Sequence, residues 1–238
     1  MCCRYLLLRA QLNEILVRLG VRGVSEAVSR YNIAPGTKIP AVRKKPGSGT
    51  RELAELSWGL VPTWANDDRV GTGLINARAE SLTEKPSFRD AFRARRCLIP
   101  ASGFYEWKAI GRVRQPWLFQ LRSEPPFFLA GLWESWTAPD GATLETCAVI
   151  TTEPNSLMQP IHHRMPAILP MEVADQWLEP TDQLDHLAAK FLLPFPPDQM
   201  MARLVSSRVN SAGNDDEGCL EPAGVDGDAG DGQLAWDL

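Results

Sequence analysis

Apolar residues recur at helical spacing in four short, well-separated segments of the chain. The first spans residues 11–19 and is ended by Gly20, whose missing side chain suits a helix C-terminus. The second is SFRDAFRARR, which Ser87 can cap and whose apolar stripe begins at Phe88. Two more, MEVADQWL and TDQLDHLAAKFL, are separated by Pro180. The pattern therefore predicts a few separate helices rather than a bundle.

Strand-like apolar runs are more numerous than helical ones. Residues 38–44 and 52–60 flank the hairpin KKPGSGTR, and the runs CLIPASGFYEW, PWLFQLR, FFLAGLWESW and LETCAVITT follow. The Asp-Gly of TAPDGAT predicts a hairpin between the last two, MPAILP predicts another strand, and residues 153–159 predict one or two helical turns. Strands and helices do not alternate. We therefore expect an α+β fold, a single domain with a mostly antiparallel, barrel-like β core flanked by a few helices.

Charge is distributed unevenly along the 238 residues. The net charge is -4, which by itself argues against a polyanion as partner. The segment after Arg208 contains eight acidic residues and no Lys or Arg. The chain before those eight residues carries 25 basic and 21 acidic residues, a net charge of +4. We therefore expect a mildly basic domain over residues 1–213 and an acidic, Gly/Asp-rich, disordered tail over residues 214–238.

The start of the chain and the cysteines indicate the compartment. The opening MCCRYLLLRAQLNE is too charged for a signal peptide, and no apolar run is long enough to span a bilayer. The five cysteines are odd in number and form no CxxC pair, so neither a disulfide framework nor a zinc ribbon is indicated. Cys97 and Cys147 lie in apolar runs, which is typical of buried packing residues. We expect a cytoplasmic monomer with no membrane partner, metal or cofactor, associated with the nucleoid if the source is bacterial.

Cys2 is the first candidate for chemistry. Removal of the initiator Met leaves an N-terminal cysteine, which carries an α-amine and a thiol on adjacent carbons. The α-amine has a reference pKa of about 7.7–8.0, so part of it is neutral near pH 7 and condenses with an aldehyde to an imine. The thiol then adds to the imine carbon and closes a thiazolidine ring. The alternative is that Cys2 is simply the residue that follows the initiator Met and has no function of its own.

Three polar residues lie within apolar runs: Asn76 in GLINARAE, Glu106 in SGFYEWK and His162 in QPIHHRMP. A carboxylate between Tyr105 and Trp107 is expected to be desolvated, which raises its pKa toward general acid/base use. Each residue also has a structural explanation: a turn for Asn76, an Arg partner for Glu106 and packing for His162. Spacing alone does not show whether they converge with Cys2.

Basic and aromatic residues near these candidates are compatible with nucleic acid. The basic residues are Arg4, Arg78, Lys85, Arg89, Arg93, Arg95, Arg96 and Arg164. Trp64 in the loop-like WGLVPTWAND can stack on a base. Core packing of the Trp and a solvated helix face for residues 93–96 explain the same features. Composition alone therefore does not establish DNA binding.

Taken in order, these motifs resemble the SRAP family, the SOS response-associated peptidases and abasic-site processing proteins. The matching pieces are MCCRY at the start, YNIAPG from Tyr31, WGLVPTW (58–64), NARAE (76–80), KPSFRDAFRARRCLIPASGFYEWK (85–108), AGLWE (130–134), ITTEPN and HHRMPAIL (162–169). They cover the chain to about Asn214. Several separate motifs in the same order make the resemblance specific.

The resemblance implies a covalent crosslink between the N-terminal Cys and abasic sites in single-stranded DNA, which shields the lesion. By position, Cys2 is the nucleophile, Asn76 orients the opened sugar or the Cys2 backbone, Glu106 is the general acid/base, and His162 assists ring opening and crosslink reversal. The DNA contacts that the resemblance implies are Pro35, Trp64, Arg78, Thr151 and Arg164, and the basic surface adds Arg4, Lys85 and Arg89 as expected contacts. Removal of Met1, autocatalytic or by an aminopeptidase, and a lyase activity are also implied.

The sequence departs from the family pattern at two positions. Cys3 replaces the usual Gly and adds a second thiol, and Ala65 follows Trp64 where some relatives have another Trp. Two other functions stay open: a thiol peptidase acting on proteins through the Cys, His and Asn set, and a non-catalytic nucleic-acid-binding module. The N-terminus discriminates, because only thiazolidine chemistry needs a free α-amine.

Overall fold

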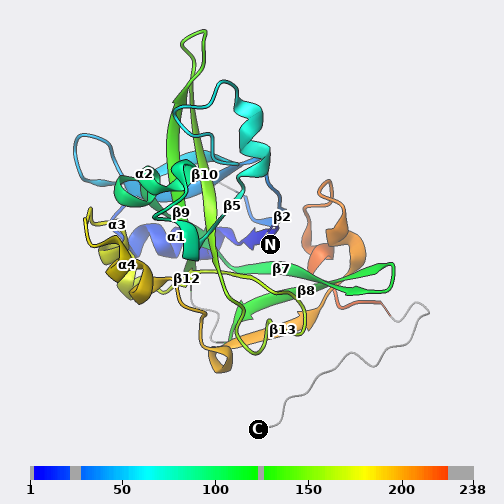
Figure 1. Ribbon diagram of the computed structural model, residues 1–238. Helices are drawn as coiled ribbons and strands as arrows, with labels where there is room; N and C mark the ends of the chain where they lie inside the picture. Colours follow the sequence, from blue (N-terminus) through cyan, green and yellow to red (C-terminus); the bar gives the residue numbers. More distant parts are fainter. Residues whose placement is uncertain (1–2, 22–27, 123–125, 225–238) are drawn as a thin grey trace.

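A closed β barrel forms the centre of the computed structural model, which describes residues 3–21, 28–122 and 126–224 (Figure 1). Its five strands are β3 (Lys38–Lys44), β4 (Arg51–Trp58), β6 (Arg96–Ala101), β9 (Phe127–Thr137) and β10 (Thr143–Thr152). β10 pairs parallel with β4, while the other neighbours pair antiparallel, and the β9–β10 pairing closes the ring. The expected barrel-like, mostly antiparallel core is confirmed.

Three short strands extend the barrel at its rim. β5 (Asn76–Arg78) pairs parallel with β10, β11 (Met165–Pro166) pairs antiparallel with β10, and β12 (Ile168–Leu169) pairs antiparallel with β9. β9 and β10 are the long hairpin that rises at the top of Figure 1, joined by a tight turn in which Gly141 has a φ of +86°. An L side chain rarely adopts that conformation, which explains the Asp-Gly signal.

A second, antiparallel sheet packs beside the barrel. Its order is β13 (Met200–Leu204), β8 (Val113–Leu121), β7 (Gly103–Ile110), β1 (Tyr5–Leu7) and β2 (Arg30–Ile33). Alternate residues of a strand face opposite sides, so one face of this sheet meets the barrel and the other meets the C-terminal segment.

Helices cover the outside of the barrel (Figure 1). They are α1 (Arg9–Arg18), α2 (Pro86–Ala94), α3 (Ala174–Leu178) and α4 (Leu184–Phe191), with short 3-10 helices at Asp68–Gly73, Ala79–Ser81, Met171–Val173, Pro197–Gln199, Ser207–Asn210 and Glu217–Leu220. Ser87 does not cap α2, because the helix begins one residue earlier with Pro86 in the first turn. Residues 156–161 form hydrogen-bonded turns rather than a helix. No helix in the described ranges is long and apolar enough to cross a membrane.

The core is built from the residues that the apolar pattern selected. Cys97 and Cys147 are fully buried, which confirms them as packing residues. The expectation that Arg96 belongs to the basic surface is wrong, because its side chain is buried. Its guanidinium donates to the carbonyl oxygens of Trp177 and Phe92, and these bonds compensate the burial of the charge.

The segment after β13 folds back onto the second sheet, where Figure 1 shows it beside β2 and β7. Val205 forms a β-bridge with Pro222, and Cys219 is fully buried in a small second core. The Asp215 carboxylate accepts hydrogen bonds from the backbone N–H groups of Tyr31 at 2.5 Å and Asn32 at 2.8 Å.

The expectation of a disordered tail from Asn214 is therefore wrong for residues 214–224. Asp215 also receives a bond from the Arg30 guanidinium, so three donors compensate the partial burial of its charge. Local composition does not reveal these donors, because they lie about 185 positions earlier in the chain. The remainder of the predicted tail, residues 225–238, lies outside the described residues.

Replacing Asp215 with alanine is expected to destabilise the fold. Two backbone N–H groups lose their acceptor, at a cost of about 2–3 kcal/mol, which lowers the melting temperature by about 4–10 °C. Asp182→Ala is the matched control, since Asp182 pairs with Arg93 at an exposed position and its loss is expected to change the melting temperature by under about 2 °C. Equal melting temperatures for the two variants would contradict the anchoring role of Asp215.

Candidate functional site

Glu106 lies on β7 and is almost completely buried. In the strand it stands between Tyr105 and Trp107 and opposite Trp117 on β8. Burial disfavours the charged carboxylate and raises the pKa of Glu106 above its ordinary value. The sequence-based expectation of a desolvated carboxylate therefore agrees with the structure. A raised pKa brings a carboxyl group closer to the pH range in which it can both accept and donate a proton.

His162 faces Glu106 from the loop between β10 and β11. Its Nδ1 lies 3.8 Å from the Oε1 of Glu106, although 56 positions separate the two residues in the chain. The same Nδ1 lies 3.0 Å from the backbone nitrogen and 3.0 Å from the carbonyl oxygen of Arg164. Burial lowers the pKa of His162, so the neutral imidazole prevails at pH 7. His163, whose ring centroid is 4.4 Å away, is exposed.

The start of the chain runs along the strand that carries Glu106. β1 pairs with β7 through Tyr5 opposite Phe104, and the Tyr105 N–H donates to the carbonyl oxygen of Arg4 at 3.0 Å. Burial and then the charge of Glu106 raise the pKa of the Cys3 thiol. Cys3 therefore lies within electrostatic reach of Glu106. Cys2 itself lies outside the described residues.

Asn76 is held by the barrel, on a short strand that pairs with β10. It opens β5, and the parallel register places Asn76 beside Val149 and Arg78 beside Thr151 on β10. Thr151 is fully buried, and its carbonyl oxygen accepts a hydrogen bond from Arg164 at 2.7 Å. Asn76 and His162 thus belong to segments that meet on β10, although the sequence separates them by 86 positions.

A matching family model decides the classification. The model described as SOS response associated peptidase (SRAP) matches residues 1–212. The chain belongs to the SRAP family. The resemblance read from the sequence motifs is confirmed.

Curated proteins and a solved structure are similar to this protein over most of the chain. Abasic site processing protein YoqW of Bacillus subtilis is 45% identical over 192 residues, which are 80% of this chain and 85% of that protein. Abasic site processing protein HMCES of Gallus gallus is 30% identical over 222 residues, covering 81% of this chain and 66% of that protein. A crystal structure of a Bacteroides thetaiotaomicron protein superimposes with a TM-score of 0.83 at 28% identity, covering 93% of this chain and 100% of that one.

Of the residues expected to contact DNA, Thr151 is fully buried, and the others divide into an open and an engaged group. Arg78, Lys85 and Arg89 are exposed, and Trp64 has 59% of its surface exposed. Pro35 is half-buried and lines a cavity of about 380 Å³. These five residues are accessible to a ligand, and their role in DNA binding stays a prediction.

Arg4 and Arg164 are engaged within the protein. Arg4 donates to the Asn32 side chain at 2.9 Å and to the Val209 carbonyl oxygen at 2.8 Å, so it ties the first strand to the C-terminal segment. Arg164 has 9% of its surface exposed and makes two bonds to the Glu80 carboxylate, at 2.7 and 2.9 Å. Their expected phosphate contacts would have to share donors with these bonds.

Glu80 is a site residue that the sequence reasoning missed. Burial opposes its ionisation, but the Arg164 guanidinium outweighs burial and lowers the pKa of Glu80. The ionised pair fixes Arg164, whose backbone N–H in turn contacts His162. The last letter of NARAE was the available signal, since Glu80 follows Asn76 by four residues in the same motif.

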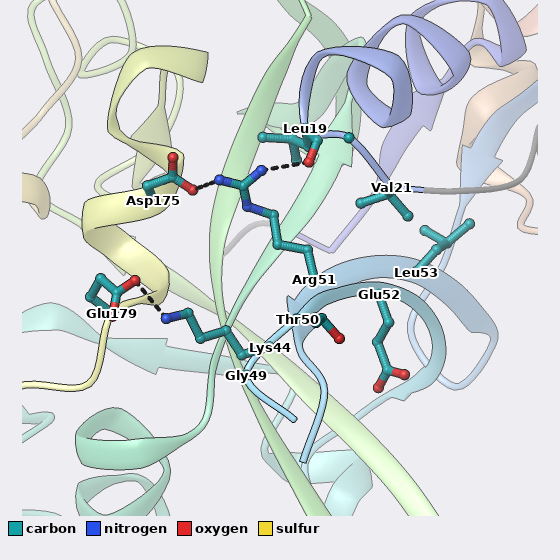
Figure 2. A pocket seen from close by; sticks show the side chains of 11 residues that line it. Leu19, Val21, Lys44, Gly49, Thr50, Arg51, Glu52, Leu53, Asp175 and Glu179 are labelled. Atoms are coloured by element: carbon teal, nitrogen blue, oxygen red, sulfur yellow. Dashed lines mark hydrogen bonds and ion pairs between the residues drawn. The ribbon is translucent and has the colours of Figure 1, made fainter. Parts of the chain in front are cut away.

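A separate hollow of about 860 Å³ lies between the β3–β4 hairpin and α3 (Figure 2). Arg51 bridges its wall by pairing with Asp175, and Lys44 pairs with Glu179 at 2.5 Å. The charges of Arg51 and Lys44 are thus compensated by acidic neighbours. None of the residues that line this hollow belongs to the site around Glu106 and His162. Among the residues that the structure describes, no group of three or more His, Cys, Asp or Glu side chains is arranged to hold a metal ion.

Proposed function

We propose that the protein processes abasic sites in single-stranded DNA by forming a thiazolidine crosslink through Cys2. The observation that carries the proposal is the buried Glu106 carboxylate, 3.8 Å from His162 and on the strand that pairs with the start of the chain. The curated SRAP relatives, which are named abasic site processing proteins, supply the substrate class. We also propose that it acts as a monomer in the cytoplasm, at the nucleoid if the source is bacterial.

The reaction needs three balanced steps. Hydrolysis of the Met1–Cys2 peptide bond consumes a water and leaves the α-amine of Cys2, with the Cys2 thiol as the nucleophile if removal is autocatalytic. The amine adds to the aldehyde carbon of the opened abasic sugar and loses a water to give the imine. The Cys2 sulfur then bonds to the imine carbon, and its proton passes to the nitrogen, which closes the thiazolidine.

Each neighbouring residue has a role in these steps. Glu106, with its raised pKa, takes a proton from the α-amine and returns one to the departing hydroxyl of the carbinolamine. His162, neutral at pH 7, assists opening of the sugar and reversal of the crosslink. Asn76 orients the opened sugar. Trp64 stacks on a base beside the lesion, and Arg78, Lys85 and Arg89 bind phosphates.

The proposal predicts a covalent product that depends on the lesion. Single-stranded DNA containing one uracil is treated with a uracil glycosylase, incubated with the protein and resolved on a denaturing gel after heating. We expect a heat-stable shifted band with treated DNA and none with untreated DNA. Intact-protein mass spectrometry is expected to show that Met1 is absent.

The same experiment separates the other two functions. A non-catalytic binding module gives salt-sensitive binding and no band with treated DNA. A thiol peptidase does not need a free α-amine, so retention of Met1 in an active protein contradicts the thiazolidine mechanism. If protein that has fully lost Met1 gives no band with treated DNA, the proposal is overturned.

A further inference from the structure

The β7–β8 hairpin extends outward from the site and carries features that the chemistry of the site does not use. Figure 1 shows it projecting beyond the body of the molecule, beside the C-terminal segment. Glu106 lies near its base, and a two-residue turn, Gly111 and Arg112, closes its far end between Ile110 and Val113.

The register of the hairpin determines which side chains share the face of Glu106. Residues opposite each other on antiparallel strands lie on the same face, and that face repeats every second residue. Moving outward, the face carries the pairs Glu106–Trp117, Lys108–Gln115 and Ile110–Val113. One face therefore runs from the buried carboxylate, through a cation and an amide, to an apolar pair at the tip.

The side chains on this face become more exposed along the same direction. Glu106 and Trp117 are buried, and Lys108 and Gln115 are half-buried. At the tip, Ile110 has 49% and Val113 has 62% of its surface exposed, although both are large apolar residues. Exposure of such a pair at the end of a projecting hairpin costs free energy when no partner covers it.

The charge of the hairpin indicates what covers the pair. Lys108 lies on the same face as the pair, and Arg112 lies in the turn beside it, whereas Arg114, opposite Ala109, lies on the other face. Residues 107–122 contain no Asp or Glu. Arg112 and Arg114 are exposed, and none of the hydrogen bonds or ion pairs described in the structure engages these three side chains. Cations around an apolar pair complement a nucleic-acid strand, which offers phosphates and the apolar faces of bases.

We propose that the β7–β8 hairpin is a second DNA contact, which binds the strand that flanks the lesion. Lys108 and Arg112 bind its phosphates, and the Ile110–Val113 pair covers the face of an unstacked base, as apolar side chains do when they insert between bases. The inference rests on the proposed function, because it takes the DNA at Glu106 as its starting point. Ile110 lies four steps along the strand from Glu106, a distance of about 13 Å, so only a flank of several nucleotides reaches the tip.

The test compares two abasic substrates. One is a trinucleotide with a single nucleotide on each side of the lesion, and the other is a 21-mer with the lesion at its centre. The initial rate of adduct formation is measured by intact-protein mass spectrometry at subsaturating DNA for wild type and for Ile110→Ser/Val113→Ser. We expect the variant to be about fivefold slower on the 21-mer and equal to wild type on the trinucleotide.

A charge variant tests the same contact independently of the apolar pair. Affinity for an undamaged single-stranded 21-mer is measured by fluorescence anisotropy over a range of salt concentrations. Lys108→Gln/Arg112→Gln is expected to reduce the slope of log affinity against log salt by about 1.4, since each phosphate contact to a single strand contributes about 0.7. For the serine variant of the apolar pair, Leu193→Ser is the matched control, because Leu193 is an exposed apolar residue (60%) beyond the C-terminus of α4 and outside the site.

The outcomes separate this inference from the proposed function. Equal rates for variant and wild type on the 21-mer, or an unchanged salt slope for the charge variant, would overturn the hairpin contact. An equal loss on both substrates would also overturn it, because that result indicates damage to the site itself. If wild type forms no adduct with either substrate, the proposed function fails, and the anisotropy of the undamaged 21-mer still tests the hairpin.

Discussion

Replacing Cys2 with alanine is expected to eliminate the heat-stable product between the protein and abasic single-stranded DNA. Where an aminopeptidase removes Met1, alanine at position 2 still carries a free α-amine, so an imine forms, but no sulfur is present to add to the imine carbon and close the ring. An imine hydrolyses on heating, whereas a thiazolidine persists. The measurement is the fraction of oligonucleotide retained in the shifted band after heating, which is expected to fall to background.

Two further variants show whether the sulfur or merely a thiol near the site is required. Cys3→Ala removes the neighbouring thiol, whose raised pKa keeps it protonated, and is expected to crosslink at the wild-type rate. Cys2→Ala is expected to give a band only when borohydride is added, since reduction converts the imine to a stable amine. A Cys2→Ala protein that crosslinks like wild type without reductant would exclude the thiazolidine mechanism.

Glu106→Gln is expected to slow crosslink formation by about a hundredfold, the lower range for loss of a general acid/base. The amide occupies the same volume but cannot exchange a proton with the α-amine or the carbinolamine. The wild-type rate is expected to rise with pH as Glu106 ionises and again as the α-amine loses its proton, and the variant is expected to keep only the rise from the α-amine. The measurement is the single-turnover rate between pH 5 and 9, with noncovalent affinity for undamaged DNA as the check on binding.

The thermal stability of Glu106→Gln is a second measurement, and it is expected to increase at high pH although the crosslinking rate falls. The folded-state pKa of Glu106 is raised, so its contribution to stability is complete at low pH and is lost as the pH rises through that pKa. At pH 8 the buried charge destabilises the fold, and Glu106→Gln is expected to raise the melting temperature there. A variant that is slower and less stable at pH 8 would indicate a structural role instead.

Glu134→Gln is the matched control for a buried carboxylate outside the site. Glu134 lies on β9, has 5% of its surface exposed and accepts a bond from Arg95 at 2.7 Å. Its replacement weakens a buried ion pair, so the melting temperature is expected to fall while the crosslinking rate stays at the wild-type value. An equal loss of rate in both variants would remove Glu106 from the mechanism.

The apolar pattern predicted most helices and strands because the periodicity of each one depends only on residues that are consecutive in the chain. The apolar spacing of residues 11–19 matches α1, and residues 38–44 coincide with β3. The start of α2 was misplaced because Pro86 suits the first helical turn better than Ser87 suits the cap. Barrel closure through β9 and β10 and the parallel β4–β10 pairing had no signal in the sequence, because pairing between distant strands leaves no local period.

For the site, the sequence by itself determined which residue types are available: a cysteine at position 2, a carboxylate between aromatic residues and the family motifs that contain them. Only the tertiary structure decided that Glu106 and His162 lie 3.8 Å apart and that Glu80 holds Arg164. Only it showed that Asp215, in a segment expected to be disordered, anchors β2. The physical reason is that hydrogen bonding, burial and charge pairing depend on distances in space, and residues far apart in the chain acquire those distances only when the strands pair.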